Sequence, residues 1–308
     1  MMCISRLAAG AAGGVGGRQL SRRRSFTAYS SVIALLGLMV FGASGARAAL
    51  VYGVSLSNTL FSFDSSDPTT LLSGAAISGL ASNESVRAID FRPANGQLYA
   101  LGSFGHIYTL NLTTGAASLV STLAADPSDS TSPFVALSGT DFGIDFDPVA
   151  DRLRVVSNAR QNLRVNITNG LTITDSDLNP NNPNVAAAAY TSAGQLFTID
   201  SESDMLNIQN PANNGMQSPV GSLGIDVGAL GGLDILSSPA GNAAFAALTP
   251  VGSSITNFYT VNLGTGAATL VGQIDGGFLV TDIAVIPEPA TLGLLGLGVL
   301  GLLRRRLR

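Results

Sequence analysis

Four aspartates stand at matching places in short apolar segments and are the strongest candidates for a functional site. They are Asp90 in "AIDF", Asp145 in "GIDF", Asp234 in "LDIL" and Asp282 in "TDIA", while a fifth segment holds Ala189 at this place. If the segments are inner strands of a radial fold, the four carboxylates lie near one axis and offer the oxygen ligands that Ca²⁺ prefers. The alternative, which we favour, is that each carboxylate binds the backbone of the turn that follows it.

A second candidate site is formed by arginines, because four of the six between residues 49 and 285 fall close together in the sequence. These four residues are Arg152, Arg154, Arg160 and Arg164. They could bind an anion or a sugar acid, since a guanidinium group binds a carboxylate through two hydrogen bonds. The interpretation that we favour is salt bridging to nearby carboxylates, namely Asp145, Asp147 and Asp151.

Other kinds of catalytic site are poorly supported by the residue types present. His106 is the only histidine and Cys3 the only cysteine, so a metal site of nitrogen or sulfur ligands and thiol chemistry are excluded from the main domain. A Ser-His-Asp triad would have to use His106, and no G-x-S-x-G sequence is present. We expect His106 to be a hydrogen-bonded or exposed residue on a strand.

The charge of the main domain excludes one class of partner. Residues 49–285 contain six Arg, no Lys and nineteen Asp plus Glu, which is a net charge of −13. Such a surface repels nucleic acid and anionic lipid, so we expect no nucleic-acid partner.

The elements that must position these side chains are short strands. Val, Ile, Leu, Phe and Thr alternate in short runs that Gly, Asn, Asp and Pro interrupt, which predicts an all-β domain. Two hairpins are nearly the same: "YTLNLTTGAASLV" at Tyr108–Val120 aligns without a gap with "YTVNLGTGAATLV" at Tyr259–Val271. Internal repeats of this kind indicate a fold built from packed copies of one unit.

Four units of four strands can be traced along the chain. Their first strands begin near Val86, Asp141, Val185 and Gly231. A fifth unit needs both ends of the domain, because residues 50–77 supply three strands and 279–285 the innermost one. We therefore predict a five-bladed β-propeller of four-stranded blades whose ring is closed by the N- and C-terminal strands. Six or seven blades would need further strands in the loops, and a β-sandwich would leave the repeat unexplained.

The N-terminal region is typical of an export signal. Arg22, Arg23 and Arg24 precede an apolar run, and Ala46-Arg47-Ala48 forms an A-x-A cleavage site. We predict a signal peptide over residues 1–48, removed by signal peptidase.

The C-terminal segment, residues 286–308, has three parts in order. Pro287-Glu288-Pro289 comes first, an uncharged run over 290–303 follows, and an Arg-rich end closes the chain. This arrangement resembles the PEP-CTERM sorting signal of exported bacterial proteins. The resemblance implies that an exosortase cuts near Pro-Glu-Pro after the short apolar segment has anchored the chain in the inner membrane. It further implies delivery to the cell surface and its exopolysaccharide.

The main domain, residues 49–285, carries a second resemblance. "AIDFRPANGQLYALG", "DRLRVVSNARQNLRVN" and "IYTLNLTTGAASLV" are similar to the motifs of a domain-of-unknown-function family found in exported bacterial proteins. That resemblance supports the repeat fold and implies no activity.

Two classes of function agree with these observations. One is a non-catalytic surface or matrix propeller that binds glycan or protein. The other is a propeller hydrolase or lactonase that uses channel carboxylates, with or without Ca²⁺. Glycosidases use a pair of carboxylic acids that often includes Glu, and Glu84 and Glu202 are the only glutamates before the sorting signal. We therefore favour the binding class.

Overall fold

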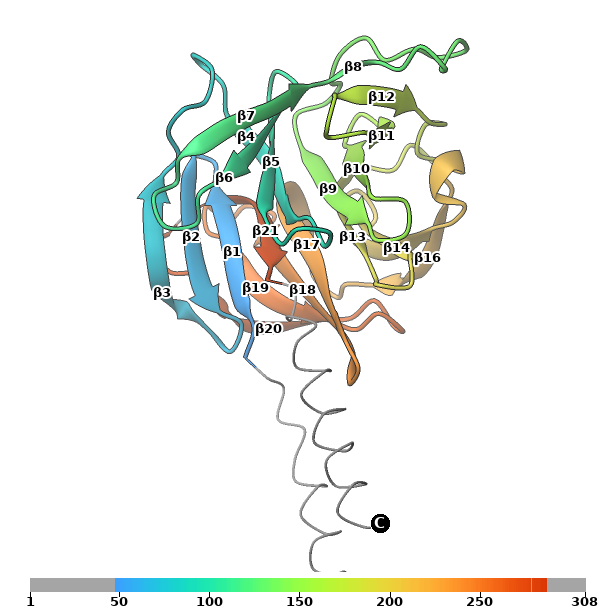
Figure 1. Ribbon diagram of the computed structural model, residues 1–308. Coiled ribbons are helices and arrows are strands. Elements are labelled where there is room, and N and C mark those ends of the chain that lie inside the picture. Colours follow the sequence, from blue (N-terminus) through green and yellow to red (C-terminus); the bar gives the residue numbers. More distant parts are fainter. Residues whose placement is uncertain (1–47, 278, 287–308) are drawn as a thin grey trace, which may run out of the picture. The chain divides into compact units, whose positions relative to one another are not determined.

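The computed structural model describes residues 48–277 and 279–286 of the 308-residue chain. The chain divides into two units, Met1–Arg47 and Ala48–Arg308, and all described residues belong to the second unit. They form five antiparallel sheets, arranged as the blades of a β-propeller (Figure 1).

Blade I joins both ends of the domain, because its innermost strand is the last of the chain. In the order β21-β1-β2-β3, its strands are β21 (Val280–Val285), β1 (Leu50–Ser55), β2 (Thr59–Asp64) and β3 (Asp67–Ala76). Strands β1 and β21 pair in antiparallel register, from Val51 opposite Val285 to Ser55 opposite Val280. The prediction that terminal strands close the ring is confirmed.

Blades II and III follow along the chain. Blade II consists of β4 (Val86–Phe91), β5 (Leu98–Gly102), β6 (His106–Leu110) and β7 (Ala117–Thr122). Blade III consists of β9 (Phe142–Asp147), β10 (Arg152–Ser157), β11 (Asn162–Val165) and β12 (Leu171–Thr174), with β8 (Ala124–Ala125) at its outer edge.

The short strand β8 makes blade III five-stranded, where the sequence predicted four strands. It pairs in parallel with β12, with Leu171 opposite Ala124. Two residues are too few to show an alternating pattern, so the sequence carries no signal for this strand.

Blades IV and V complete the ring. Blade IV consists of β13 (Val185–Tyr190), β14 (Leu196–Asp200), β15 (Met205–Gln209) and β16 (Gln217–Ser222), with the 3₁₀ helix η1 (Ala212–Asn214) before its last strand. Blade V consists of β17 (Val227–Ser238), β18 (Gly241–Pro250), β19 (Asn257–Val261) and β20 (Ala268–Gln273).

The five inner strands surround the axis in the order β4, β9, β13, β17 and β21, each in contact with the next, and β21 returns to β4. Strand β9 passes so close to β13 that a side chain at Gly143 would meet the backbone of Ala187 and Ala188. Glycine is therefore required at this point of the ring.

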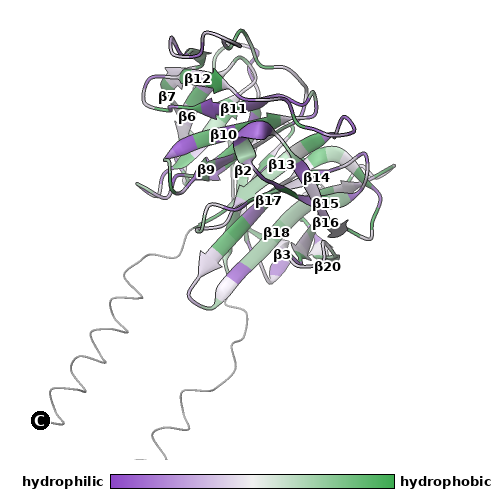
Figure 2. Cartoon of the chain, turned by 90° about the vertical axis from the view of Figure 1, so that its right-hand side faces the viewer, coloured by the Kyte–Doolittle hydropathy of each residue, from purple (hydrophilic) through white to green (hydrophobic). Residues whose placement is uncertain are grey.

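The hydrophobic core lies between the blades, where adjacent sheets face each other. A separate cluster of buried residues fills each of the five interfaces. Between blades V and I, for example, the Phe63 and Phe258 rings meet edge to face at 4.9 Å between centroids. The inner strands β4 and β21 are buried almost completely, whereas the outer strand β7 is mostly exposed (Figure 2 colours the chain by hydropathy). Each blade therefore depends on two neighbours for its stability, as in other repeat folds.

The closing strand is predicted to be essential for cooperative folding. A protein ending at residue 278 should lose its sharp urea transition, because β1 loses its inner partner and the core between blades V and I loses Val280, Ile283 and Val285. Circular dichroism against urea measures this, with a protein ending at residue 286 as the control. Equal transitions for the two proteins would show that closure by β21 is dispensable.

Candidate functional site

The aspartates of the inner strands join neighbouring blades along the axis. Oδ2 of Asp282, on β21, accepts a hydrogen bond from the backbone N–H of Ile89, on β4, at 2.9 Å. Oδ2 of Asp90, on β4, accepts one from Phe146, on β9, at 2.8 Å. We call such a contact, from a carboxyl group to a backbone amide of the adjacent inner strand, an axial latch.

Two further axial latches continue the ring. Oδ2 of Asp145 accepts the N–H of Tyr190 at 2.7 Å, which joins blade III to blade IV. Oδ2 of Asp234 accepts the N–H of Val285 at 2.5 Å, which joins blade V to blade I. The prediction that each carboxylate binds its own following turn is therefore wrong, since these bonds cross to another blade.

The remaining interface, between blades IV and V, has no axial latch among the described residues because Ala189 occupies the aspartate position. The N–H of Ile235 instead binds Oδ1 of the preceding residue, Asp234, at 2.6 Å. Nearby, the N–H of Ser192 binds Oγ of Ser237 at 2.9 Å across the same interface. Blades IV and V are thus joined through a hydroxyl group where other blades use a carboxyl group.

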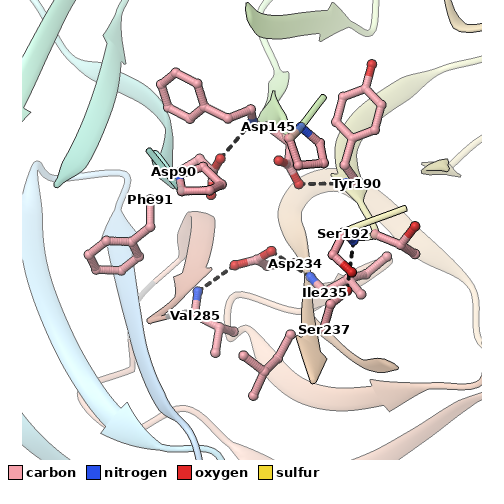
Figure 3. Close-up of a pocket in the computed structure, with 14 residues that line it drawn as sticks. Asp90, Phe91, Asp145, Tyr190, Ser192, Asp234, Ile235, Ser237 and Val285 are labelled. Atoms are coloured by element: carbon pink, nitrogen blue, oxygen red, sulfur yellow. Dashed lines mark hydrogen bonds between the residues drawn. The ribbon is translucent and has the colours of Figure 1, made fainter. Parts of the chain in front are cut away.

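A cavity of about 150 Å³ lies where the inner strands end, and it contains three of these aspartates. The buried part of its wall includes Asp90, Phe91, Asp145, Phe146, Tyr190 and Asp234. The side that reaches solvent includes Pro93, Pro148, Ser192, Leu236 and Ser237. Figure 3 shows the carboxyl groups of Asp90, Asp145 and Asp234 gathered around this space. We call it the axial pocket.

Burial controls the protonation of these acids. It raises the pKa of Asp90 well above the ordinary value, and the charge of Asp234 raises it further. The pKa of Asp145 is raised in the same way by burial and by the charges of Asp90 and Asp234. Burial also raises the pKa of Asp234 to about 6 and that of Asp282 well above its usual range. An aspartate in water has a pKa near 3.9, so the ring holds protons that an exposed acid releases.

The side chains of Asp90 and Asp145 lie within hydrogen-bonding reach of each other. We call these two residues the axial pair. Two carboxyl groups at this separation share a proton more readily than both ionise.

The four aspartates meet near the axis, but the geometry gives no support to a calcium site. Within residues 48–277 and 279–286, no three side chains of His, Cys, Asp or Glu are grouped to hold a metal ion. Each aspartate also gives at least one oxygen to a backbone amide, and Asp234 and Asp282 give both, whereas Ca²⁺ takes six to eight oxygen ligands.

The arginine candidates do not form one surface. Arg154 is buried, with its side chain 2% exposed, and donates to Oδ2 of Asp175 at 2.7 Å, Oδ1 of Asn162 at 2.8 Å and Oδ1 of Asn213 at 2.7 Å. Arg164 binds both oxygens of Asp175 at 2.7 and 2.8 Å. These contacts favour the salt-bridge interpretation of Arg154 and Arg164.

The other two arginines lie apart from this network. Arg160 lies 3.8 Å from Asp177 and donates to Asn182, and Arg152 is exposed at the start of β10. For Arg154, Arg160 and Arg164 the expected partners Asp145, Asp147 and Asp151 were wrong, since these arginines pair with Asp175 or Asp177. Asp151 pairs instead with Arg92 of blade II.

His106 is a hydrogen-bonded residue at the start of β6. Its Nδ1 lies 2.9 Å from Oε2 of Glu84, a side chain that is fully buried. The Tyr108 hydroxyl donates to the same oxygen at 2.6 Å, and the N–H of Phe104 donates to Oε1. Glu84 therefore acts as a buried acceptor that fixes the β5–β6 hairpin.

The residues of the export signals lie almost wholly outside the described part of the chain. This holds for Ala46 of the cleavage site, for Pro287, Glu288 and Pro289, and for the apolar run 290–303. Ala48 is exposed at the first described position, and Ala49 beside it is buried. Among the residues that the structure describes, no helix is long and apolar enough to span a bilayer.

The aromatic and hydroxyl residues of the axial pocket escaped the sequence analysis. Phe91 and Phe146 directly follow Asp90 and Asp145, and Tyr190 follows Ala189. An aromatic residue after the axial position thus recurs in three blades, and this repeat was the signal that could have revealed them.

Arg154→Ala is expected to destabilise the domain by about 2–5 kcal/mol, because it leaves a cavity in place of a buried side chain and removes one donor each from Asp175, Asn162 and Asn213. Arg152→Ala is the matched control on the same strand and should change the unfolding free energy by less than about 0.5 kcal/mol. Urea unfolding measures both. An unaltered Arg154→Ala protein would return this residue to the list of ligand-binding candidates.

The stability of the domain is predicted to fall as the pH rises from 5 to 8. A raised pKa means that the folded state binds more protons than the unfolded state in this window, so deprotonation favours unfolding. Asp234, with a pKa of about 6, accounts for a loss on the order of 1–2 kcal/mol. Urea titrations at pH 5, 6.5 and 8 should show this slope, and Asp234→Asn should reduce it. A stability that increases over the same range would refute the assignment.

Comparison with solved structures finds similarities of low sequence identity over most of the chain. Among solved structures, a nidogen/laminin complex is similar at 12% identity and a TM-score of 0.46, covering 78% of this chain and 98% of the other. A protein from Lactobacillus plantarum is similar at 11% identity and a TM-score of 0.42, covering 78% and 99%. An inactive virginiamycin B lyase from Staphylococcus aureus has 11% identity and a TM-score of 0.39, covering 74% and 71%. A search of curated proteins finds no match.

Two family models match the chain and account for most of its length. Residues 285–307 match the PEP-CTERM protein-sorting motif, which implies an exported protein that is processed by exosortase and transiently anchored through its C-terminus. Residues 59–284 match the domain of unknown function DUF4394. The chain therefore belongs to the DUF4394 family and carries a PEP-CTERM sorting motif.

Proposed function

We propose that this exported propeller is a non-catalytic binding module of the cell surface or extracellular matrix. In this proposal the axial pocket receives a small group that projects from a larger glycan or protein. The observation that carries the proposal is the pocket itself: a cavity of about 150 Å³ with polar groups in an otherwise apolar and aromatic wall. Binding sites for small molecules are commonly concave and mostly apolar, with a few fixed polar groups.

The roles of the carboxyl groups support binding rather than catalysis. Asp90, Asp145 and Asp234 each accept a backbone N–H from the neighbouring blade, so each has a structural role in the ring. Groups fixed in this way are suited to rigid recognition, since little conformational entropy is lost on binding.

The processing steps complete the proposal. Signal peptidase removes residues 1–48, and exosortase then acts near Pro287-Glu288-Pro289. The propeller, residues 49–285, is released or transferred to the surface, where the exopolysaccharide of the producing cell is the partner that we propose.

A hydrolase or lactonase remains the second candidate because of one observation. The axial pair has raised pKa values inside a pocket, and shared protons between close carboxyl groups occur in acid–base catalysis. Turnover of a glycan or lactone that is abolished by Asp145→Asn would favour this candidate.

Blocking the mouth of the pocket should abolish binding. Ser192 is exposed and lines the pocket, and its hydrogen bond to Ser237 is donated by the backbone, so Ser192→Trp keeps that bond and adds an indole at the mouth. We expect the exported Ser192→Trp protein to lose at least tenfold in affinity for isolated exopolysaccharide, measured by co-sedimentation.

Ala193→Trp is the matched control, because Ala193 is exposed, adjacent and outside the pocket wall. It should bind as the unmodified protein does. If both variants bind polysaccharide normally while their melting temperatures are unchanged, the axial pocket is not the binding site.

A further inference from the structure

The C-terminal tail leaves the propeller beside the axial pocket. Val285 lines the pocket, and the N–H of the next residue, Ile286, binds the carbonyl oxygen of Leu50. Strand β1 therefore begins where β21 ends, on one side of the domain (Figure 1). We propose that this side, which holds the mouth of the axial pocket, faces the bilayer in which the exported chain is anchored.

The first argument is the length of chain between the propeller and its anchor. The uncharged run that can enter a bilayer begins at residue 290, so only residues 287–289 separate it from Ile286. An extended chain spans at most about 3.5 Å per residue, which limits the distance from residue 286 to residue 290 to about 14 Å. The anchored propeller is therefore held close to the lipid surface.

The second argument compares this tether with the size of the domain. A compact domain of the length of residues 49–285 has a radius of gyration of about 18 Å. Strand β21 is the innermost strand of its blade, so the tail starts close to the axis and not at the outer edge of the propeller. A tether of about 14 Å is shorter than the distance from the axis to that edge. It therefore cannot bring the outer edge or the opposite side of the propeller to the bilayer.

The third argument is the charge of the turns on the pocket side. We call the turns that join each inner strand to the second strand of its blade the mouth turns. They comprise residues 92–97, 148–151, 191–195 and 239–240. The charged residues in these four ranges are Arg92 and Asp151, and they pair with each other at 2.8 Å between Nε and Oδ1. The mouth turns are thus neutral in a domain with a net charge of −13.

The opposite side of the propeller is acidic. It contains the turns after the second strands, together with the segments that adjoin these turns before the inner strands. Five acids on this side face a single arginine: Asp141, Asp177, Glu202, Asp204 and Asp226, against Arg160. Acidic groups are repelled by anionic lipid headgroups, so the charge distribution favours the same orientation as the short tether.

This orientation closes the pocket to large ligands until the tail is cut. Headgroups cover the hydrocarbon core by about 6 Å on each side, so a tether of about 14 Å leaves a gap of about 8 Å above them. An α-helix is about 10–12 Å across, so the gap admits small solutes and excludes a folded protein or a bulky glycan. Cleavage by exosortase then opens the pocket to polysaccharide, a consequence that rests on the proposed function.

The test measures the accessibility of the mouth turns in the anchored protein. Cys3 is removed with the signal peptide, so a single introduced cysteine is a specific reporter. Ala193→Cys places it on a mouth turn and Ser254→Cys on the opposite side, and both positions are exposed. The full chain without residues 1–48 is inserted into phosphatidylcholine vesicles, where no exosortase is present. A maleimide on a long polyethylene glycol is the bulky reagent, and N-ethylmaleimide is the small one.

We expect the bulky reagent to label Ala193→Cys at least tenfold more slowly than Ser254→Cys, while N-ethylmaleimide labels both at similar rates. Ala240→Cys, on another mouth turn, should behave like Ala193→Cys. A Gly-Ser spacer of about 30 residues between residues 286 and 287 should abolish the difference, because its root-mean-square length of about 30 Å exceeds the radius of the domain. The spacer variant remains anchored, so it isolates the effect of tether length.

Three results would overturn the inference. The first is equal labelling of Ala193→Cys by the bulky reagent with and without the spacer. The second is protection of Ser254→Cys in place of Ala193→Cys, which would mean that the opposite side faces the lipid. The third is protection of Ala193→Cys that persists with the spacer, because the short tether would then not be its cause.

The outcome is separable from that of the proposed function, since the labelling involves no ligand. If the mouth turns are shielded while Ser192→Trp leaves polysaccharide capture unchanged, the orientation stands and the proposed binding site is wrong. If the mouth turns are freely labelled while Ser192→Trp abolishes capture, the pocket binds polysaccharide and the tail does not control access to it.

Discussion

The hydrogen bond from a backbone amide to a buried carboxyl group is the contact on which the ring depends. Four such bonds tie neighbouring inner strands at the axis, where five strands converge and few side chains fit. Burying four acids so close together is unfavourable unless some remain protonated, and the raised pKa values express that cost. The same arrangement that joins the blades therefore creates a polar, proton-binding centre, so stability and recognition depend on one set of residues.

Much of the architecture could be predicted because the repeat places equivalent residues at regular intervals. The near-identical hairpins revealed the blades, and an incomplete first unit required the terminal strand Val280–Val285. The partners of the polar residues could not be predicted. Asp90 reaches Phe146, and Arg154 reaches Asn213, across interfaces between blades, and the rotation of one sheet against the next determines those contacts. Local patterns describe single blades and carry little information on such rotations.

The interface between blades IV and V shows how the ring tolerates an exception. Because Ala189 stands at the fifth axial position, the axis holds four carboxyl groups and not five, which limits the electrostatic repulsion there. The amide of Ile235, equivalent to those of Phe146 and Tyr190, is bound within its own strand by Asp234, as that of Ile283 is by Asp282. One side of the pocket is in consequence formed by Ser192 and Ser237, and its neutral hydroxyl groups contrast with the acids opposite.

The closing strand also has a mechanical role that follows from its position. Residue 286 continues directly from β21, and its N–H binds the carbonyl oxygen of Leu50 at 3.1 Å, next to the bond between Val285 and Asp234. While the chain is anchored through its C-terminus, the anchor is joined to the propeller through β21, so a pull on it reaches these two bonds and the ladder between β21 and β1 before the rest of the domain. The strand that completes the ring is thus also the one that bears the load of attachment.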